Sequence, residues 1–350
     1  MPPQDESPHN TRADALHERA LVLLAHDHMV LPEQLRRDRK GGVTAKVVQA
    51  TVDAHAFSYD RAEYERSLYS AEGFMADAMK AYDSLLETVD SNPAEFLIVR
   101  KAADIEEAKK SGRLGLILGS EGGKLLEGSL AVLRNFYRLG MRHLEFHWAI
   151  RNQLGTAQRD LDEGGLTEFG HEVVTEMNRL GMIIDVSHSS PNSIADALAT
   201  TTKPIINSHT GARALQPDSP QLLWDDQLKR LAENGGVAAV HFCSSVLVGR
   251  DRKPATVEDL LAHIEHLVKV AGIESVGLGP DFVADPGPLL RNVCFNQKSP
   301  YESFVWTEDL DDSSKLRNLT RALVERGYSD SDVSKILGGN LMRVFESSLG

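Results

Sequence analysis

Short apolar segments alternate with longer amphipathic segments along almost the whole chain. The apolar segments are rich in β-branched residues and bounded by turn-forming residues, which is typical of buried strands. They predict eight strands, at 20–26, 43–52, 114–120, 142–148, 182–188, 204–209, 237–243 and 276–282.

The connections between these strands have helical periodicity. In the segment 167–180, Thr167 can cap the first turn, Val173 and Met177 lie four residues apart on one face, and Gly181 can end the helix. Helices are likewise predicted at 192–199 and 225–234, and a long, polar, helix-like connection is predicted at 62–89.

Buried strands joined by helices predict a parallel sheet, and eight of them favour a closed (β/α)₈ TIM barrel. An open, doubly wound sheet is the alternative, but no GxGxxG motif follows the first strand, which disfavours a dinucleotide-binding fold. No repeat or low-complexity linker interrupts the chain. We therefore expect one barrel domain over 1–350, with a polar N-terminal tail at about 1–16 and helices at the C-terminus.

Composition narrows the functional classes. The chain is 41% hydrophobic and 25% charged, as in ordinary globular proteins, and its formal net charge of -13 argues against nucleic acid or anionic membrane as a partner. Its first residues are polar and no later segment has the length of apolar sequence that a membrane span needs, so a cytoplasmic protein is expected. The two cysteines, Cys243 and Cys294, form no disulfide framework or CxxC pair.

Residues able to bind metals or transfer protons gather at the ends of the predicted strands. In a barrel the active site lies at the carboxyl ends of the strands, so such residues should meet there. The residues so placed are His26, His28, Glu121, His147, Trp148, His188, His209, His241 and Asp281.

Five of these residues predict a metal centre. His26 and His28 lie two residues apart on one strand, so they should point the same way, into the barrel mouth. Together with Glu121, His188 and His209 they form a nitrogen and oxygen donor set suited to Zn²⁺, with Mn²⁺, Fe²⁺ and Co²⁺ as weaker competitors. Because five ligands exceed the need of one tetrahedral ion, we expect two ions bridged by Glu121. One would be held by the first histidine pair and the other by the second.

A pair of ions predicts hydrolysis. The ions lower the pKa of the water between them, which gives a hydroxide nucleophile at neutral pH, and they polarise the bond to be cleaved. Asp281 can accept the proton of that water and pass it to the leaving amine. Two of these residues also have a purely structural interpretation. Glu121, which precedes Gly122 and Gly123, could stand at the start of a helix, and Asp281 could stabilise a turn.

Longer motifs resemble the renal or membrane dipeptidases, peptidase family M19 of the amidohydrolase superfamily. The motifs are GSEGG (119–123), LAVLRNFYRLGMRHLEFHW (130–148), GGLTEFGHEVVTEMNRLGMIIDVSHSS (164–190), INSHTGARAL (206–215), LAENGGVAAVHF (231–242), VGLGPDF (276–282) and ERGYSDSDVSKILGGNLMRVF (325–345). The resemblance implies a barrel with a binuclear zinc centre, hydrolysis of dipeptides that have free amino and carboxyl ends, and a homodimer. Its metal ligands fall on His26, His28, Glu121, His188 and His209, and its proton-shuttling aspartate falls on Asp281.

The chain departs from the family at positions that define a dipeptidase. The family motif HxD reads HDH here, so His28 replaces an aspartate and the site should lose one negative charge. The family's substrate-binding arginine is absent from 216–223, where Pro220 stands, and Arg151 or Arg291 is a candidate replacement.

Other differences concern residues that would face the substrate. The family histidine that stabilises the tetrahedral intermediate aligns with Trp148, directly after His147, and His241 stands where asparagine is common. His147, Trp148, Arg151 and His241 are therefore the candidate substrate-binding residues.

These observations favour a metal-dependent hydrolase of an amide bond in a small dipeptide-like molecule. A second hypothesis keeps the metal site but changes the reaction, to hydrolysis of a lactam or lactone intermediate or to a non-hydrolytic step. A third is a catalytically inactive relative that binds a ligand.

Overall fold

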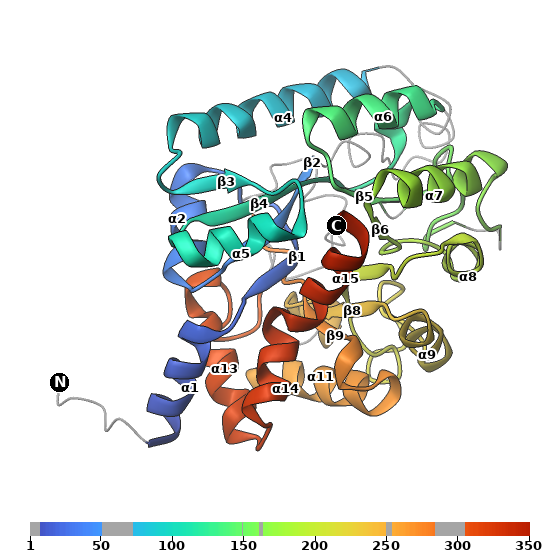
Figure 1. Ribbon diagram of the computed structural model, residues 1–350. Helices are drawn as coiled ribbons and strands as arrows, with labels where there is room; N and C mark the ends of the chain where they lie inside the picture. The colour runs from blue at the N-terminus through green and yellow to red at the C-terminus, as the bar shows by residue number, and fades with distance from the viewer. Residues whose placement is uncertain (1–7, 51–72, 149, 161–163, 250–253, 284–304) are drawn as a thin grey trace.

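The computed structural model describes residues 8–50, 73–148, 150–160, 164–249, 254–283 and 305–350. Parallel strands form the centre of the molecule and helices surround them (Figure 1). The strands are β1 (Leu23–Asp27), β2 (Ala45–Ala50), β3 (Phe96–Ile98), β4 (Leu114–Ser120), β5 (His143–Glu145), β6 (Ile183–Asp185), β7 (Ile206–Thr210), β8 (Val237–Val240) and β9 (Val276–Leu278).

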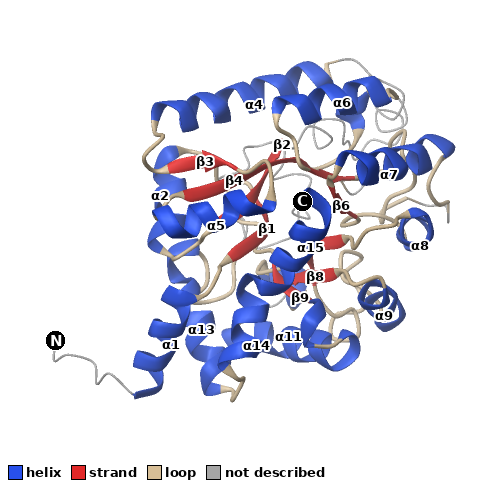
Figure 2. Cartoon of the chain, in the orientation of Figure 1, coloured by secondary structure: helices blue, strands red, loops and turns tan. Residues whose placement is uncertain are grey.

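Eight of the strands form a ring. Their order is β4-β2-β1-β9-β8-β7-β6-β5, and every named pairing is parallel. Isolated bridges from Leu118 to Met141 and from Glu121 to Glu145 join β4 to the β5 segment and close the ring. Figure 2 shows the strands enclosed by helices. The predicted barrel is confirmed.

The remaining strand, β3, was not predicted. It pairs with the first half of β4, with Phe96 beside Leu114 and Ile98 beside Leu116. Because β5 joins only the second half of β4, β3 lies outside the ring. Three residues are too few to show a strand periodicity, so the sequence pattern predicted eight strands where the described residues form nine.

Helices occupy the connections. They are α1 (Pro8–Arg19), α2 (Pro32–Lys40), α4 (Phe74–Ser91), α5 (Ala102–Ser111), α6 (Leu130–Leu139), α7 (Glu168–Leu180), α8 (Pro191–Thr200), α9 (Asp225–Glu233), α10 (Ser244–Leu247), α11 (Val257–Ala271), α13 (Leu316–Glu325), α14 (Asp330–Ser334) and α15 (Asn340–Leu349), with short turns η2 (Lys124–Leu126), η3 (Ile273–Ser275) and η4 (Ser313–Lys315) and a π-helical turn η5 (Lys335–Gly339). None of the helices in the described ranges is long and apolar enough to cross a bilayer.

The predicted helix ends are confirmed where they were argued. Thr167 caps α7 by accepting a hydrogen bond from the backbone nitrogen of Gly170 (3.0 Å), and Gly181 ends it with φ 77°. The connection predicted at 62–89 contains α4, which begins at Phe74, whereas residues 51–72 lie outside the described part of the chain.

The segment predicted as a polar tail is helical from Pro8 onward. In α1, Ala13 and Leu16 are buried, and His17 Nδ1 lies 2.7 Å from the hydroxyl of Thr320 in α13. Ala13, Leu16 and His17 are spaced so that they share one face of α1, and α1 packs against the C-terminal helices α13 and α14. These contacts explain why a mainly polar segment is ordered.

The C-terminal helix α15 closes the amino-terminal end of the barrel. Inward-facing strand residues, among them Leu23 and Ile183, pack in one cluster with Leu341, Val344 and Phe345. The helix contacts β1, β6, β8 and β9, and Figure 1 shows it in front of the ring. With this end filled by apolar side chains, the opposite end is left for polar residues.

Candidate metal centre

Register shifts in two strands turn histidines toward the barrel mouth. Leu24 and Asp27 of β1 pair with Lys46 and Val48 of β2, so three steps on β1 match two on β2, as at a β-bulge. Leu23 and Ala25 belong to the cluster with α15, and strict alternation from them would point Asp27 inward. The shift lets His26 and His28 face the site instead, while Asp27 contacts Lys46 on the outside.

Strand β7 has the same irregularity. Asn207 and Thr210 pair with Ala238 and Val240 of β8, again three steps against two. His209 lies within this interval and reaches the site from the strand. Each register shift therefore turns a site histidine toward the metal centre.

The first histidine pair lies beside two carboxylates. His26 Nε2 and His28 Nε2 are 3.0 Å apart. Asp281 Oδ1 is 3.1 Å from His28 Nε2 and 3.5 Å from His26 Nε2. The two oxygens of Glu121 lie 3.7 Å from His26 Nε2 and 3.5 Å from His28 Nε2.

The second histidine pair shares Glu121 with the first. His188 Nε2 and His209 Nε2 are 2.9 Å apart, and Glu121 Oε1 is 3.3 Å from His188 Nε2. Glu121 is almost fully buried. Its carboxylate thus stands between two pairs of imidazole nitrogens.

These separations fit a metal. Ligands bound to zinc at 2.0–2.1 Å in tetrahedral geometry lie roughly 3.3 Å from each other, close to the distances above. The opposite nitrogens of the rings have their own partners, since His188 Nδ1 lies 2.7 Å from Gln158 Nε2 and His209 Nδ1 lies 2.9 Å from Ser208 Oγ. Such outer contacts hold ligating histidines in orientation. The donor set and its supports therefore suit a metal ion.

Burial keeps most of these imidazoles neutral. Loss of solvation lowers the pKa of His188 and of His209 to about 3, and it lowers the pKa of His26 well below its usual value. A metal binds the neutral form of histidine. Three of the four histidines are thus already in the form that a metal requires.

His28 differs from the others. Burial alone would lower the pKa of His28, but the charge of Glu121 and the hydrogen bond with Asp281 raise it to about 9. Burial would likewise raise the pKa of Asp281, but hydrogen bonds from His241 and His28 hold it well below its usual value. An arriving cation would take the place of the proton on His28.

Two site residues have left-handed backbone conformations. His188 and Asp281 both have φ 58°. Histidine and aspartate tolerate this region better than most residues, and such conformations cluster at functional sites. The Asp281 turn is tied to β1, because its backbone nitrogen donates to His26 O (3.2 Å) and His28 N donates to Phe282 O (3.0 Å).

The candidate substrate-binding residues lie at different places around the site. His147 is buried, its Nδ1 lies 2.9 Å from Ser189 Oγ, and burial lowers its pKa to about 3. The ring of Trp148 is 6.4 Å from the ring of His188, centroid to centroid. Both residues follow β5, which ends at Glu145 rather than at 148 as predicted.

The cationic candidates are less well placed. Arg151 Nε lies 3.5 Å from Asp160 Oδ1, an almost fully buried carboxylate, and Arg291 falls outside the described residues.

His241 lies 3.2 Å from Asp281, so it contacts the predicted proton shuttle. Arg159, which was not predicted, lies near enough to His188 for its charge to lower the pKa of that residue.

Sequence reasoning also missed Glu145. This fully buried residue ends β5 and stands among His26, Glu121 and His209, with one potential ligand atom of each within 4.8 Å of the others. The buried cluster therefore contains one carboxylate more than the sequence analysis predicted. The signal was alternation along 142–148, which places His143, Glu145 and His147 on one face.

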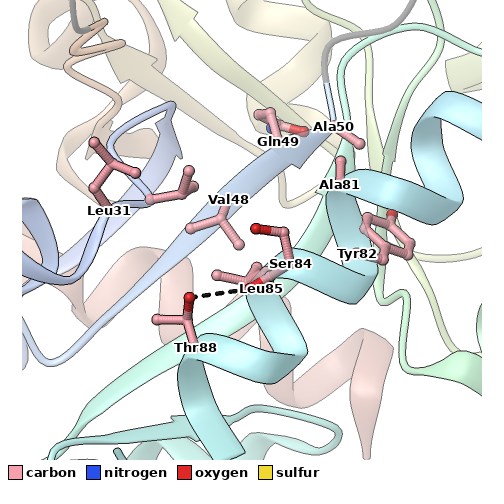
Figure 3. Close-up of a pocket in the computed structure, with 10 residues that line it drawn as sticks. Leu31, Val48, Gln49, Ala50, Ala81, Tyr82, Ser84, Leu85 and Thr88 are labelled. Carbon is pink, nitrogen blue, oxygen red and sulfur yellow. Dashed lines mark hydrogen bonds between the residues drawn. The ribbon is translucent and has the colours of Figure 1, made fainter. Parts of the chain in front are cut away.

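An apolar cavity of about 150 Å³ borders the centre. Figure 3 shows it between β2, which contributes Val48 and Gln49, and α4, which contributes Leu85 and Thr88. Thr88 donates its hydroxyl to Ser84 O within the helix (3.0 Å), so it offers the cavity no free donor. Gln49 Nε2 lies 3.1 Å from His26 Nδ1 and so joins the cavity wall to the metal centre.

A (β/α)₈ barrel with buried histidines and carboxylates at its carboxyl end is the architecture of metal-dependent hydrolases of the amidohydrolase type. The sequence matches the model of the membrane dipeptidase family, peptidase family M19, over residues 16–294 and 298–348. The chain belongs to this family. The resemblance stated from the motifs is thereby confirmed.

Individual relatives agree with the family. Dipeptidase tcpJ of Claviceps purpurea is 33% identical over 273 residues, covering 77% of this chain and 59% of that protein. The uncharacterized dipeptidase C965.12 of Schizosaccharomyces pombe is 36% identical over 248 residues, covering 69% of this chain and 54% of that protein. The matched region thus spans little more than half the length of these relatives.

Among solved structures, an amidohydrolase from Pseudomonas aeruginosa is 26% identical, with a TM-score of 0.83. The alignment covers 97% of this chain and 99% of that one. The whole barrel, rather than a fragment of it, is therefore shared.

Proposed function

We propose that this protein is a zinc-dependent hydrolase that uses two metal ions to cleave the amide bond of a dipeptide or a dipeptide-like small molecule. The position of Glu121 between the pair His26 and His28 and the pair His188 and His209 carries the proposal. One carboxylate within reach of two imidazole pairs suits a bridging ligand. The dipeptidase relatives support the same reaction class.

The residues of the chain would divide the work. Zinc bound here would supply a Lewis acid that acidifies water and polarises the scissile carbonyl. Asp281 has one oxygen facing His28 and the other held by His241, so Oδ1 is the oxygen placed to accept the proton of the attacking water. The same oxygen would then deliver that proton to the leaving amine.

The test is turnover of a panel of L,L- and L,D-dipeptides by zinc-loaded protein. Glu121→Gln and Asp281→Asn variants that keep the wild-type circular dichroism spectrum should lose activity, the latter by about 10²–10⁴-fold in kcat. Full activity in either variant would contradict the assigned roles.

A second candidate is hydrolysis of a lactam, lactone or other non-dipeptide substrate at the same centre. The engagement of Arg151 with Asp160 favours it, because that arginine is then less available for the carboxylate of a dipeptide. Zinc-loaded protein that hydrolyses no member of the dipeptide panel would support this candidate.

Light scattering would test the homodimer that the family resemblance implies.

A further inference from the structure

Glu145 is placed beside Glu121 by the closure of the barrel. The two residues form a parallel bridge between the β4 and β5 segments, and Gly122 N donates to Glu145 O (3.1 Å). Glu145 is fully buried. Both carboxylates therefore enter the same space from neighbouring strands.

The carboxylate of Glu145 lies close to ring nitrogens of two site histidines. Its Oε2 lies 3.4 Å from His26 Nδ1, and its Oε1 lies 3.9 Å from His188 Nε2. The first contact is made to the ring nitrogen opposite Nε2, the atom that faces His28 and Asp281. Glu145 thus has one oxygen on the Nδ1 side of His26 and the other toward Nε2 of His188, within the same buried cluster.

We propose that Glu145 is the positioning carboxylate of the metal centre and that it acts through His26. The inference rests on the proposed two-metal function. When Nε2 of a neutral histidine binds a metal, its proton is on Nδ1 and needs an acceptor. Glu145 places a carboxylate oxygen 3.4 Å from that atom, where it can accept this proton when the metal is bound, and such an acceptor would fix the tautomer and make the imidazole a better ligand.

The other neighbours of His26 Nδ1 are adaptable. Gln49 Nε2 is 3.1 Å away and Ser208 Oγ is 3.3 Å away. An amide can turn over and a hydroxyl can rotate, so either can donate or accept. A carboxylate can only accept when ionised, and so Glu145 is the neighbour that requires the proton to be on Nδ1.

The net charge of the site also supports a role for Glu145 in metal binding. Two divalent cations would bring four positive charges into a site where Glu121 and Asp281 supply two negative charges. Ionised Glu145 would add a third negative charge within the same buried cluster. Its removal should therefore weaken metal binding even where the ligands themselves are kept.

The experiment measures zinc affinity by competition with a chromophoric chelator, without substrate. Glu145→Gln keeps the size of the side chain but removes its charge, and we expect zinc affinity about 10–100-fold below wild type. Glu172→Gln makes the same change at an exposed position on α7 and should bind zinc as wild type does. Affinity of Glu145→Gln within twofold of wild type would overturn the proposal.

A second variant covers the case in which Glu145→Gln does not fold. Glu145→Asp keeps the charge but withdraws it by one methylene from His26, so its zinc affinity should fall several-fold; wild-type affinity would overturn the proposal. Thermal stability of the metal-free variants separates positioning from a merely structural role, which would lower stability without changing zinc affinity.

The outcome is distinguishable from failure of the proposed function. Wild-type protein that binds zinc tightly but hydrolyses no dipeptide would contradict the proposed function and leave the role of Glu145 standing. Active wild-type protein together with unchanged zinc affinity in Glu145→Gln would support the proposed function and contradict the role of Glu145.

Discussion

His241 Nε2 lies 3.2 Å from Asp281 Oδ2 at the mouth of the barrel. The backbone nitrogen of Cys243 donates to His241 Nδ1 (3.0 Å), so in the neutral ring the proton is on Nε2 and points at Asp281. One oxygen of Asp281 is thereby engaged, and the other, 3.1 Å from His28 Nε2, is presented to the site.

This contact predicts a catalytic effect for a residue that need not touch the substrate. His241→Leu removes the donor, and we expect kcat to fall roughly tenfold with little change in KM, because the orientation of the proton-transferring group is lost rather than substrate binding. His266→Leu is a matched control, because His266 Nε2 on α11 also lies 2.7 Å from an aspartate, but that aspartate, Asp225, does not belong to the metal centre. A His241→Leu enzyme with wild-type kcat would contradict this role.

Metal removal should lower stability as well as activity. A ligand that binds only the folded protein adds about 2.7 kcal/mol to the free energy of unfolding when its free concentration is 100 times Kd. Protein stripped with a chelator should therefore have a lower Tm, and zinc should restore both Tm and turnover. In Glu121→Gln most of the zinc-dependent rise in Tm should disappear. An unchanged Tm in wild type on adding zinc would argue against a metal centre.

A buried ion cluster supports the loop that carries His28. Lys46 Nζ lies 2.7 Å from Asp27 Oδ1 and 2.7 Å from Asp38 Oδ2, and it donates to Met29 O (2.6 Å). Asp27 also accepts from the backbone nitrogen of Met29 (2.6 Å). All three charged side chains are almost completely buried.

Lys46→Met should be strongly destabilising. It leaves two buried carboxylates without their cation, a change that typically costs about 3–5 kcal/mol in the free energy of unfolding. The triple change Lys46→Met, Asp27→Asn and Asp38→Asn removes all the charges together and should recover much of that loss. Urea denaturation of the two proteins checks this. A single variant as stable as wild type would show that the ion cluster contributes little.

Sequence pattern could place the main site residues, because strand ends converge in a barrel. Glu121, His188 and His209 come directly at or after apolar segments that the structure shows as strands. The inward orientation of His26 was predicted by alternation within its own motif. It depends, however, on a register shift relative to the preceding residues of β1, and such a shift leaves no mark in the hydrophobic pattern.

The hydrophobic pattern of the sequence did not predict the site role of Glu145 or the strand β3. Alternation places Glu145 on the same face as His143 and His147, but it does not show whether that face points into the barrel or away from it. Only the closure of β4 onto β5 shows that Glu145 is buried beside Glu121. Similarly, Phe96–Ile98 becomes a strand because the edge of β4 is available to it, which is a tertiary effect.

A histidine outside the metal centre predicts acid sensitivity. His263 on α11 is buried, its Nδ1 accepts from Ala212 N (3.0 Å), and its Nε2 lies 3.0 Å from Leu247 O, an arrangement that uses the neutral ring. Burial lowers its pKa to about 4 from the usual 6.5. Below pH 6.5 the unfolded chain takes up a proton that the folded protein excludes, so the stabilisation is complete above pH 6.5 and is lost as the pH falls toward 4.

His263→Gln should therefore change how stability depends on pH. Between pH 7 and pH 5 the free energy of unfolding of wild type should fall by about 2 kcal/mol more than that of His263→Gln, since the variant has no such group to protonate. His171→Gln, at a partly buried histidine whose Nδ1 lies 2.7 Å from Thr200 Oγ1, serves as the control. Urea denaturation of metal-free protein at the two pH values measures the difference. Equal losses in wild type and His263→Gln would mean that His263 is not held neutral by the fold.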